Sequence, residues 1–120
     1  MRLEIAGGKT RFKPGESLEG TLFWDFAVVP KGMEVKLCWQ TQGKGTQDRE
    51  VVKRLHWECS TRSDRKAFTI PLPEGPYSFS GKLVSLVWSL EAAADLAAGK
   101  AEPVNFTLSP DGNELLLHRK

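Results

Sequence analysis

The stretch MEVKLCWQT, residues 33–41, alternates between apolar and mainly polar side chains. In an extended chain, Val35, Leu37 and Trp39 point to one face, and Glu34, Lys36, Cys38 and Gln40 point to the other. A strand with one apolar face and one polar face is typical of an antiparallel sheet that covers a core on one side only. This stretch therefore predicts a β-sheet protein.

Similar runs continue on both sides of that stretch, and turns rich in Gly and Pro separate them at short intervals. Short strands at this spacing favour an all-β sandwich or barrel. The predicted strands span Arg2–Ile5, Ser17–Asp25, Met33–Thr41, Asp48–Glu58, Arg65–Leu72, Lys82–Ala92 and Ala101–Ser109, with a last extended segment in Asn113–Lys120. We expect a single domain over residues 1–120, folded as an immunoglobulin-like antiparallel β-sandwich of seven or eight strands.

The turn at residues 43–45 predicts a hairpin between the third and fourth strands. In that hairpin, the numbers of opposing residues should sum to about 89, which places Cys38 opposite Val51 and far from Cys59. A disulfide needs Cα atoms within about 7 Å, so we expect both thiols to be free. Lys53 interrupts the apolar phase of the fourth strand, which favours an edge position.

Composition excludes several classes of function. The chain has 120 residues, a net charge of +2 and a pI of about 8.6, without the basic stripe typical of nucleic-acid binding. No apolar run approaches the roughly 18–20 residues that cross a bilayer, and the N-terminus has no signal-peptide core. We therefore expect a cytoplasmic protein with reduced cysteines. Two distant histidines and the lack of a CxxC pair predict no metal site and no cofactor.

An enzymatic function has one weak candidate, His56. As a general base it would need a nucleophile within hydrogen-bond reach. The nearby Ser60, Thr61 and Ser63 lie in a polar loop without a G-x-S-x-G elbow, and Cys59 lies three positions away on a predicted strand end. The residues thus predict a surface histidine and a protein that is not an enzyme, with a small hydrolase as a distant alternative.

Partner-binding candidates come from exposed aromatic and basic residues. Trp24, Trp39 and Trp88 fall in phase with inward residues and are expected in the core, whereas Trp57 and Tyr77 are expected to be partly exposed. The basic run from Arg62 to Lys66 forms a candidate anionic-partner patch. The predicted partner-binding residues are Trp57, His56, Arg62, Arg65, Lys66 and Tyr77. The alternative function is a carbohydrate-binding module that uses a row of exposed aromatic side chains.

Two motifs go beyond a generic sandwich: FKPGESLEGTL at residues 12–22 and LPEGPYSFSGKLVSLVW at residues 72–88. Pro14 presets φ and Gly15 accepts a positive φ, which predicts a tight turn into the second strand. Gly20 in mid-strand predicts a bulge or a close backbone approach. Pro73 and Pro76 cannot donate ladder hydrogen bonds, so they belong in a connection.

In their order and spacing, these motifs resemble the arrestin superfamily, and Leu90-Glu91-Ala92 is similar to the end of its long strand. The resemblance implies an immunoglobulin-type sandwich that acts as a non-catalytic protein-interaction or scaffold module. It implies a protein partner, bound by strand addition at an edge or on a sheet face. Arrestins pair two such domains and this chain holds one, so the resemblance also implies self-association as a homodimer. The best edge candidates are the Asp48 and Ala101 strands.

Overall fold

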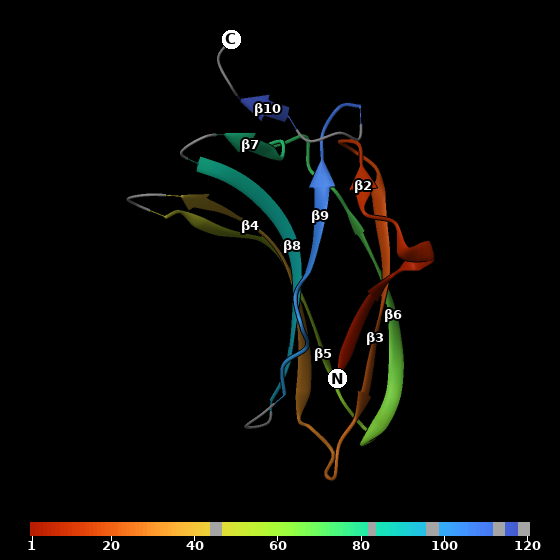
Figure 1. Cartoon of the computed structure of the whole chain (residues 1–120). Coiled ribbons are helices and arrows are strands. Elements are labelled where there is room, and N and C mark those ends of the chain that lie inside the picture. The colour runs from red at the N-terminus through yellow and green to blue at the C-terminus, as the bar shows by residue number, and fades with distance from the viewer. Residues whose placement is uncertain (44–46, 82–83, 96–98, 112–114, 118–120) are drawn as a thin grey trace.

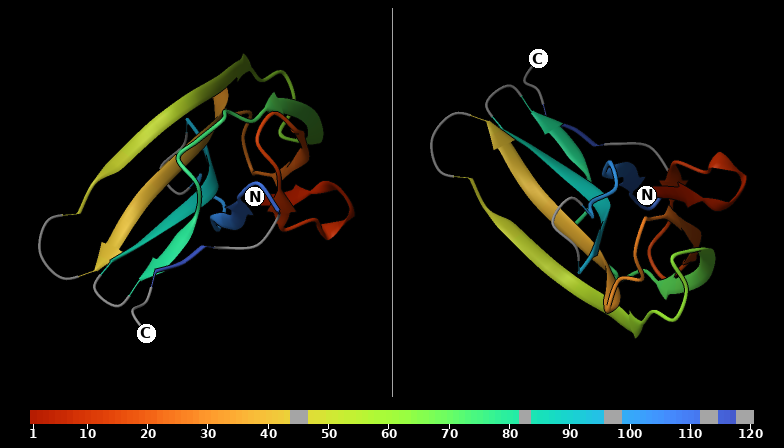
Figure 2. Two further views of the ribbon diagram at one scale, coloured as in Figure 1. Left: turned by 90° about the horizontal axis from the view of Figure 1, so that it is seen from above. Right: turned by 90° about the horizontal axis from the view of Figure 1, so that it is seen from below.

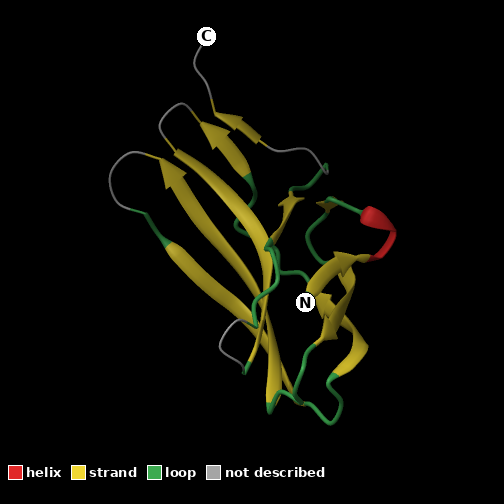
Figure 3. Ribbon diagram, turned by 60° about the horizontal axis from the view of Figure 1, so that its bottom comes forward, coloured by secondary structure: helices red, strands yellow, loops and turns green. Residues whose placement is uncertain are grey.

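A computed structural model describes residues 1–43, 47–81, 84–95, 99–111 and 115–117. These residues form strands and one short 3-10 turn, η1 (Ala6–Gly8), which lies between β1 and β2 (Figure 3). The strands are β1 (Arg2–Ile5), β2 (Arg11–Phe12), β3 (Ser17–Asp25), β4 (Gly32–Gly43), β5 (Arg49–Glu58), β6 (Ser63–Pro71), β7 (Phe79–Gly81), β8 (Val84–Ala94), β9 (Val104–Leu108) and β10 (Leu115–Leu117). Among the described residues, no helix is long and apolar enough to cross a membrane.

The strands form two sheets that face each other across a core (Figure 1). The smaller sheet has the order β1-β3-β6, and the larger has the order β10-β7-β8-β4-β5. β9 pairs with β8 and also with β2, so β2 extends the larger sheet. The predicted β-sandwich is therefore confirmed. The strands that the sequence did not predict are β2 and β7, two and three residues long.

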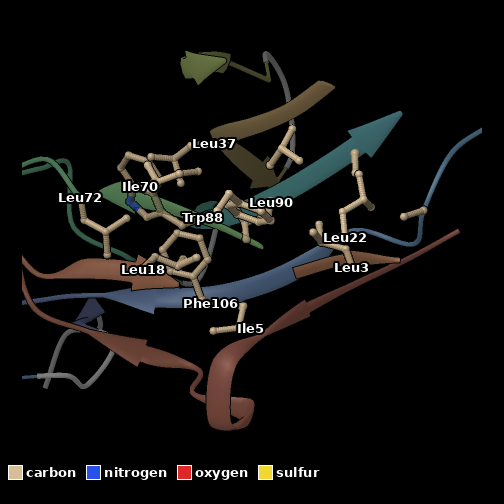
Figure 4. Packing of buried hydrophobic residues seen from close by; sticks show 14 of the residues in the cluster. Leu3, Ile5, Leu18, Leu22, Leu37, Ile70, Leu72, Trp88, Leu90 and Phe106 are labelled. Carbon is tan, nitrogen blue, oxygen red and sulfur yellow. The ribbon is translucent and has the colours of Figure 1, made fainter. Parts of the chain in front are cut away.

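The core lies between the sheets and is built from alternate residues of the strands (Figure 4). Leu18 and Leu22 of the smaller sheet and Leu90 and Trp88 of the larger sheet are completely buried. The Trp88 ring lies 6.0 Å from Phe106, and its Nε1 donates a hydrogen bond of 2.7 Å to the Pro76 carbonyl oxygen. The alternation read from the sequence thus predicted which faces are buried.

The hairpin of β4 and β5 has the predicted register over part of its length. Cys38 pairs with Val51, as expected, and the opposing numbers sum to 89 from Gln40 to Cys38. Between Leu37 and Cys38 the register shifts by one residue, which leaves Val52 as the extra residue of a β-bulge. Beyond the bulge the numbers sum to 90, and Lys53 opposes Leu37. Both cysteines are free, as predicted.

One buried-residue prediction is only partly correct. Trp39 lies on the inner face of β4 opposite Trp88, but it is half-buried. The reason is that the upper ends of β4, β5 and β8 curve away from the smaller sheet (Figure 1). Period-two alternation identifies the inner face of a strand, but it does not say how far the opposing sheet extends over it.

The turn that leads into β3 has the predicted geometry. The Glu16 amide donates to the Lys13 carbonyl oxygen (3.1 Å), and Gly15 has φ of 80°. Pro14 and Gly15 thus occupy the central positions of a type II turn. The Glu16 carboxylate accepts hydrogen bonds from Lys9 Nζ (2.7 Å) and from the Lys13 amide (2.6 Å). This carboxylate therefore ties the chain before β2 to the start of β3.

These contacts predict a pH dependence of stability. The hydrogen bond from Lys9, followed by that from the Lys13 amide, lowers the pKa of Glu16 below its ordinary value of 4.5. A depressed folded-state pKa contributes stability that is fully present above the unfolded value and is lost as pH falls through the folded value. Urea unfolding of the wild type and Glu16→Gln should therefore differ at neutral pH and converge well below pH 4.5. Glu19→Gln is the control, and a constant difference at all pH values would contradict the prediction.

The strand bounds differ from the sequence prediction at several ends. β1 and β3 have the predicted bounds, whereas β8 continues to Ala94, and an isolated bridge follows between Ala93 and Lys100. β9 begins at Val104, directly after Pro103, as the missing amide of proline requires. Of the predicted last segment, the structure describes Leu115–Leu117 as β10. The middle of the predicted hairpin turn, residues 44–46, lies outside the described residues.

Candidate partner-binding surface

One side of the sandwich ends in two strands that lack an outer neighbour. Among the described strands, β5 is the last strand of the larger sheet and β6 the last of the smaller sheet. β5 leads directly into β6, and both run along the same side of the molecule (Figure 2). An edge strand presents unpaired N–H and C=O groups with which a further strand can pair. We call the side formed by β5 and β6 the open side.

On the opposite side the sheets end in β1 and β2, and β1 also lacks an outer neighbour among the described strands. β1 pairs with β3 in the smaller sheet, and β2 pairs with β9 in the larger sheet. The polypeptide thus changes sheets between Ile5 and Arg11. The predicted edge at the Ala101 strand is only partly correct, because β9 has β8 on one side and β2 on the other side only beside Thr107 and Leu108.

The backbone of β6 presents alternate residues outward. Its register with β3 is unbroken from Ser63 to Pro71. Hydrogen bonds from the Leu72 amide to the Glu16 carbonyl oxygen (2.8 Å) and from the Phe26 amide to the Arg62 carbonyl oxygen (2.7 Å) mark the two ends of this ladder. Because the bonding alternates in an antiparallel pair, even-numbered residues of β6 bond to β3 and odd-numbered residues face outward.

Two further features of β6 agree with that assignment. The Arg65 amide donates to its neighbour Asp64 Oδ1 (2.8 Å), which an amide engaged with β3 would not do. Pro71, which has no amide hydrogen, also falls at an outward-facing position. By the same alternation, the N–H groups of Ala67 and Thr69 point away from β3, so these two amides form the open window of the β6 edge.

The backbone of β5 is less regular. Hydrogen bonds from Thr41 to Asp48 (2.8 Å) and from Cys59 to Lys31 (3.3 Å) fix which residues bond to β4 on each side of the bulge. Arg54, His56 and Glu58 then face outward at regular spacing. The Val52 bulge interrupts this spacing, and Lys53 points to the inner face beside Leu55. Bulges and inward-pointing charges are the devices by which proteins protect edge strands.

The charged side chains of the open side fall into three groups. Arg49 Nη1 and Nη2 donate to the two oxygens of Glu91 (2.8 and 2.7 Å), and Arg54 Nη1 donates to Glu34 Oε1 (2.8 Å). No ion pair among the described residues engages the exposed side chains of Lys53, Arg62, Arg65 and Lys66. The open side also carries the exposed carboxylates Glu50, Glu58 and Asp64.

The structure brings together five of the six predicted partner-binding residues. Trp57 and His56 lie on β5, Arg62 lies in the connection, and Arg65 and Lys66 lie on β6. Tyr77 does not join them, because it lies in the connection that follows the far end of β6. Whether any of the six contacts a partner stays a prediction.

Trp57 and Tyr77 are half-buried, so the prediction of their partial exposure is confirmed. Trp57 opposes Met33 and packs against the core, and its buried Nε1 has no hydrogen-bond partner among the described residues. No Trp, Tyr or Phe side chain of the chain is fully exposed, and the exposed large apolar residues of the described chain are valines. The aromatic row that a carbohydrate-binding module would use is therefore missing from the described surface.

His56 lies at one end of the open side, in a setting that offers little chemistry. A Cβ atom added to Gly32 would lie 3.0 Å from His56 Nε2, so the ring rests closely on the start of β4. The groove beside it, of about 470 Å³, is lined partly by Glu34, Glu58 and Asp95. The described residues contain no group of three or more His, Cys, Asp or Glu side chains placed to hold a metal ion.

The possible nucleophile near His56 is also poorly suited to catalysis. Burial, and then the charge of Asp64, raises the pKa of the Cys59 thiol, which favours the unreactive protonated form. Among the hydrogen bonds of the described residues, none joins Cys59 to His56. Cys38 lies on the outer face of β4. It is buried beneath Arg49, whose Nη2 lies 3.7 Å from the Cys38 Sγ. Burial raises its pKa as well.

Sequence reasoning missed the edge of β6, which is the more regular edge of the open side. A signal was present, because Pro71 falls within the predicted Arg65–Leu72 strand. A proline inside a strand indicates an edge position, because every amide of a central strand bonds to a neighbouring strand, whereas an edge strand leaves alternate amides free.

Comparisons with known proteins support the fold. No family model and no curated protein sequence matches the chain. The structure is similar to that of Spo0M, a sporulation control protein from Bacillus subtilis, with a TM-score of 0.60 and 14% identity. The match covers 90% of this chain and 49% of the Spo0M chain, so the chain spans about half of that protein. At this identity the likeness shows the fold alone, and it supports the arrestin-like sandwich that the motifs predicted.

A second similar structure is a β-glucosidase from Listeria innocua. It matches with a TM-score of 0.46 and 14% identity over 96% of this chain and 16% of the enzyme chain. A likeness this weak carries no argument about the activity of the present chain.

Proposed function

We propose that the chain is a non-catalytic protein-binding module that takes up a segment of a protein partner along its open side. The observation that carries this proposal is the pair of neighbouring strand edges, β5 and β6, whose outer sides no further described strand covers, on the side of the sandwich that carries exposed Arg62, Arg65 and Lys66. Unpaired backbone groups bind an extended segment through main-chain hydrogen bonds, and neighbouring side chains select its sequence. The exposed side chains of Arg62, Arg65 and Lys66, which form no ion pair among the described residues, supply that selection.

The arrestin-like fold supports the proposal as an analogy, because fold by itself does not define function. A second copy of the chain is one possible partner. Edge-to-edge pairing through the open side would give a symmetric dimer, in which the same surface serves both copies.

A photo-crosslinking experiment tests this function. Benzoylphenylalanine is placed at Ala67 on the open side or at Glu4 on β1, which lies at the other edge of the smaller sheet. In extract of the source organism, we expect discrete protein adducts from position 67, removed by an excess of unlabelled wild-type chain. Position 4 is the matched control, and an adduct of twice the chain mass identifies a second copy as the partner.

Identical adducts from both positions, or no adduct from position 67, would contradict binding at the open side. Mass spectrometry of the adducts identifies the partner and the crosslinked segment, so a positive result also reports whether that segment is extended.

A further inference from the structure

The two edges of the open side are not equivalent as docking sites. The β5 edge is interrupted in its middle by the Val52 bulge and by the inward-pointing Lys53. The β6 edge keeps one register with β3 over nine residues, and its outward amides at Ala67 and Thr69 are spaced as in a regular strand. A strand that pairs with β6 would therefore meet an undistorted ladder.

The inner face of β6 changes character along the strand. At its C-terminal end, Ile70 is completely buried and Phe68 is 9% exposed, both within the core cluster. Toward the N-terminal end, the next two inner-face positions are Lys66 and Asp64, and both are exposed. Residues opposite each other in an antiparallel pair share a face. An added strand thus meets two apolar neighbours and then a lysine.

The outer face of the same edge carries Thr69, Ala67 and Arg65 in the same direction. Thr69 and Ala67 are small and uncharged, and the Arg65 guanidinium is exposed without an ion pair among the described residues. The uncharged side chains of Thr69 and Ala67 are therefore followed by two adjacent basic side chains on opposite faces, Arg65 and Lys66. Opposite charges across a strand pair are favourable, and like charges are unfavourable.

We infer that the β6 edge binds an extended, antiparallel protein segment with apolar residues at two alternate positions, followed by two consecutive acidic residues. The apolar residues extend the core beside Ile70 and Phe68, and the acidic residues face Lys66 and Arg65. This inference rests on the proposed function and names both its edge and its ligand chemistry. A second copy of β6 fits less well, because full-length pairing about Ala67 would place Asp64 opposite Ile70 of the other copy.

The probe for this inference is a fluorescein-labelled peptide, Ser-Val-Thr-Val-Thr-Glu-Asp-Ser, titrated with the full chain in an anisotropy assay. Its valines face Ile70 and Phe68, and its Glu-Asp pair faces Lys66 and Arg65. We expect saturable binding that weakens with added salt, since the acidic pair is exposed. The same peptide with both threonines N-methylated is the control, and it should not bind, because it keeps the charges but lacks two ladder donors.

Thr69→Pro is the decisive protein variant. The substitution removes an outward-facing amide that β3 does not use, at a position two residues before the natural Pro71, so the fold should persist. Loss of one backbone hydrogen bond and the added ring should weaken peptide binding by at least about tenfold. Glu58→Pro removes an outward amide from β5 in the same way and should leave the peptide affinity unchanged. Circular dichroism verifies the fold of both variants.

A charge exchange tests the side-chain part of the inference. Lys66→Glu should weaken binding of the acidic peptide. A peptide with Lys in place of its Glu should restore binding to this variant but should not improve binding to the wild type. Equal binding of the N-methylated peptide would overturn strand addition even if Thr69→Pro failed to fold. Loss of binding in Glu58→Pro alone would assign the ligand to β5.

The two proposals fail in different ways. If no peptide binds but the crosslinker at Ala67 still captures a partner, the open side stands as a binding surface and the segment chemistry proposed here is wrong. If the peptide binds but no partner adduct forms at Ala67, the edge is competent for strand addition and the proposed protein-binding function is wrong.

Discussion

Replacing Trp88 by alanine is expected to lower the free energy of unfolding by about 4 kcal/mol. Trp88 is completely buried on β8, packs against Phe106 and donates a hydrogen bond of 2.7 Å to the Pro76 carbonyl oxygen. The substitution removes the largest fully buried side chain, leaves a cavity and leaves the Pro76 carbonyl oxygen without this donor. Since domains of this size have about 5–15 kcal/mol of stability, urea denaturation should show a large fall in the transition midpoint.

Two variants separate the contributions of Trp88. Trp88→Phe keeps most of the apolar volume but loses the donor to Pro76, and it should cost about half as much as the alanine variant. Val87→Ala changes the neighbouring, half-buried residue on the outer face and should cost about 1 kcal/mol. If Trp88→Ala cost no more than Val87→Ala, the central place of Trp88 in the core would be disproved.

Replacing Gly20 by alanine is the second change with a large expected effect, about 2–3 kcal/mol of lost stability. An added Cβ would lie 2.5 Å from Phe68 Cζ and 3.0 Å from the Glu4 carbonyl oxygen. The Phe68 ring is held in the core, and the carbonyl belongs to the neighbouring strand β1, so neither yields without disturbing the sheet. Of the two predicted roles of Gly20, close approach is confirmed, and a bulge is wrong because the register of β3 is continuous there.

A double-mutant cycle tests the cause of that loss. Phe68→Leu removes the ring atom that the new Cβ would strike, so Gly20→Ala should cost about 1 kcal/mol less in the Phe68→Leu background than in the wild type. Thr21→Ala, on the outer face of the same strand, is the control for a general loss of strand propensity. Additive effects of the two substitutions would show that the Phe68 contact is not the source of the strain.

The two sides of the sandwich differ in the length of their edges. On one side, β1 and β2 follow each other in sequence and pair with different sheets over four and two residues. On the open side, β5 and β6 also follow each other across the two sheets, and they pair with β4 and β3 over nine residues each. The open side therefore offers the longer edges for strand addition, and β1 provides a shorter edge of the same sheet as the crosslinking control.

The sequence alone determined the features that depend on local patterns. The bounds of β1 and β3, the inner faces of most strands, the type II turn at Pro14 and Gly15 and the pairing of Cys38 with Val51 could all be read from it. The two-residue alternation of strands, the φ restrictions of Pro and Gly and the closure of turns act over a few residues. Neighbouring residues in the sequence therefore reveal them.

The tertiary structure alone decided which strands became edges, where the Val52 bulge fell and how far the smaller sheet covered Trp39. It also separated Tyr77 from the other five candidate residues and placed the β6 edge beside them. These features follow from pairings between strands far apart in sequence, such as β3 with β6 and β2 with β9. The pattern of a strand records that it has a buried face, but its neighbours are selected by the packing of the whole sandwich.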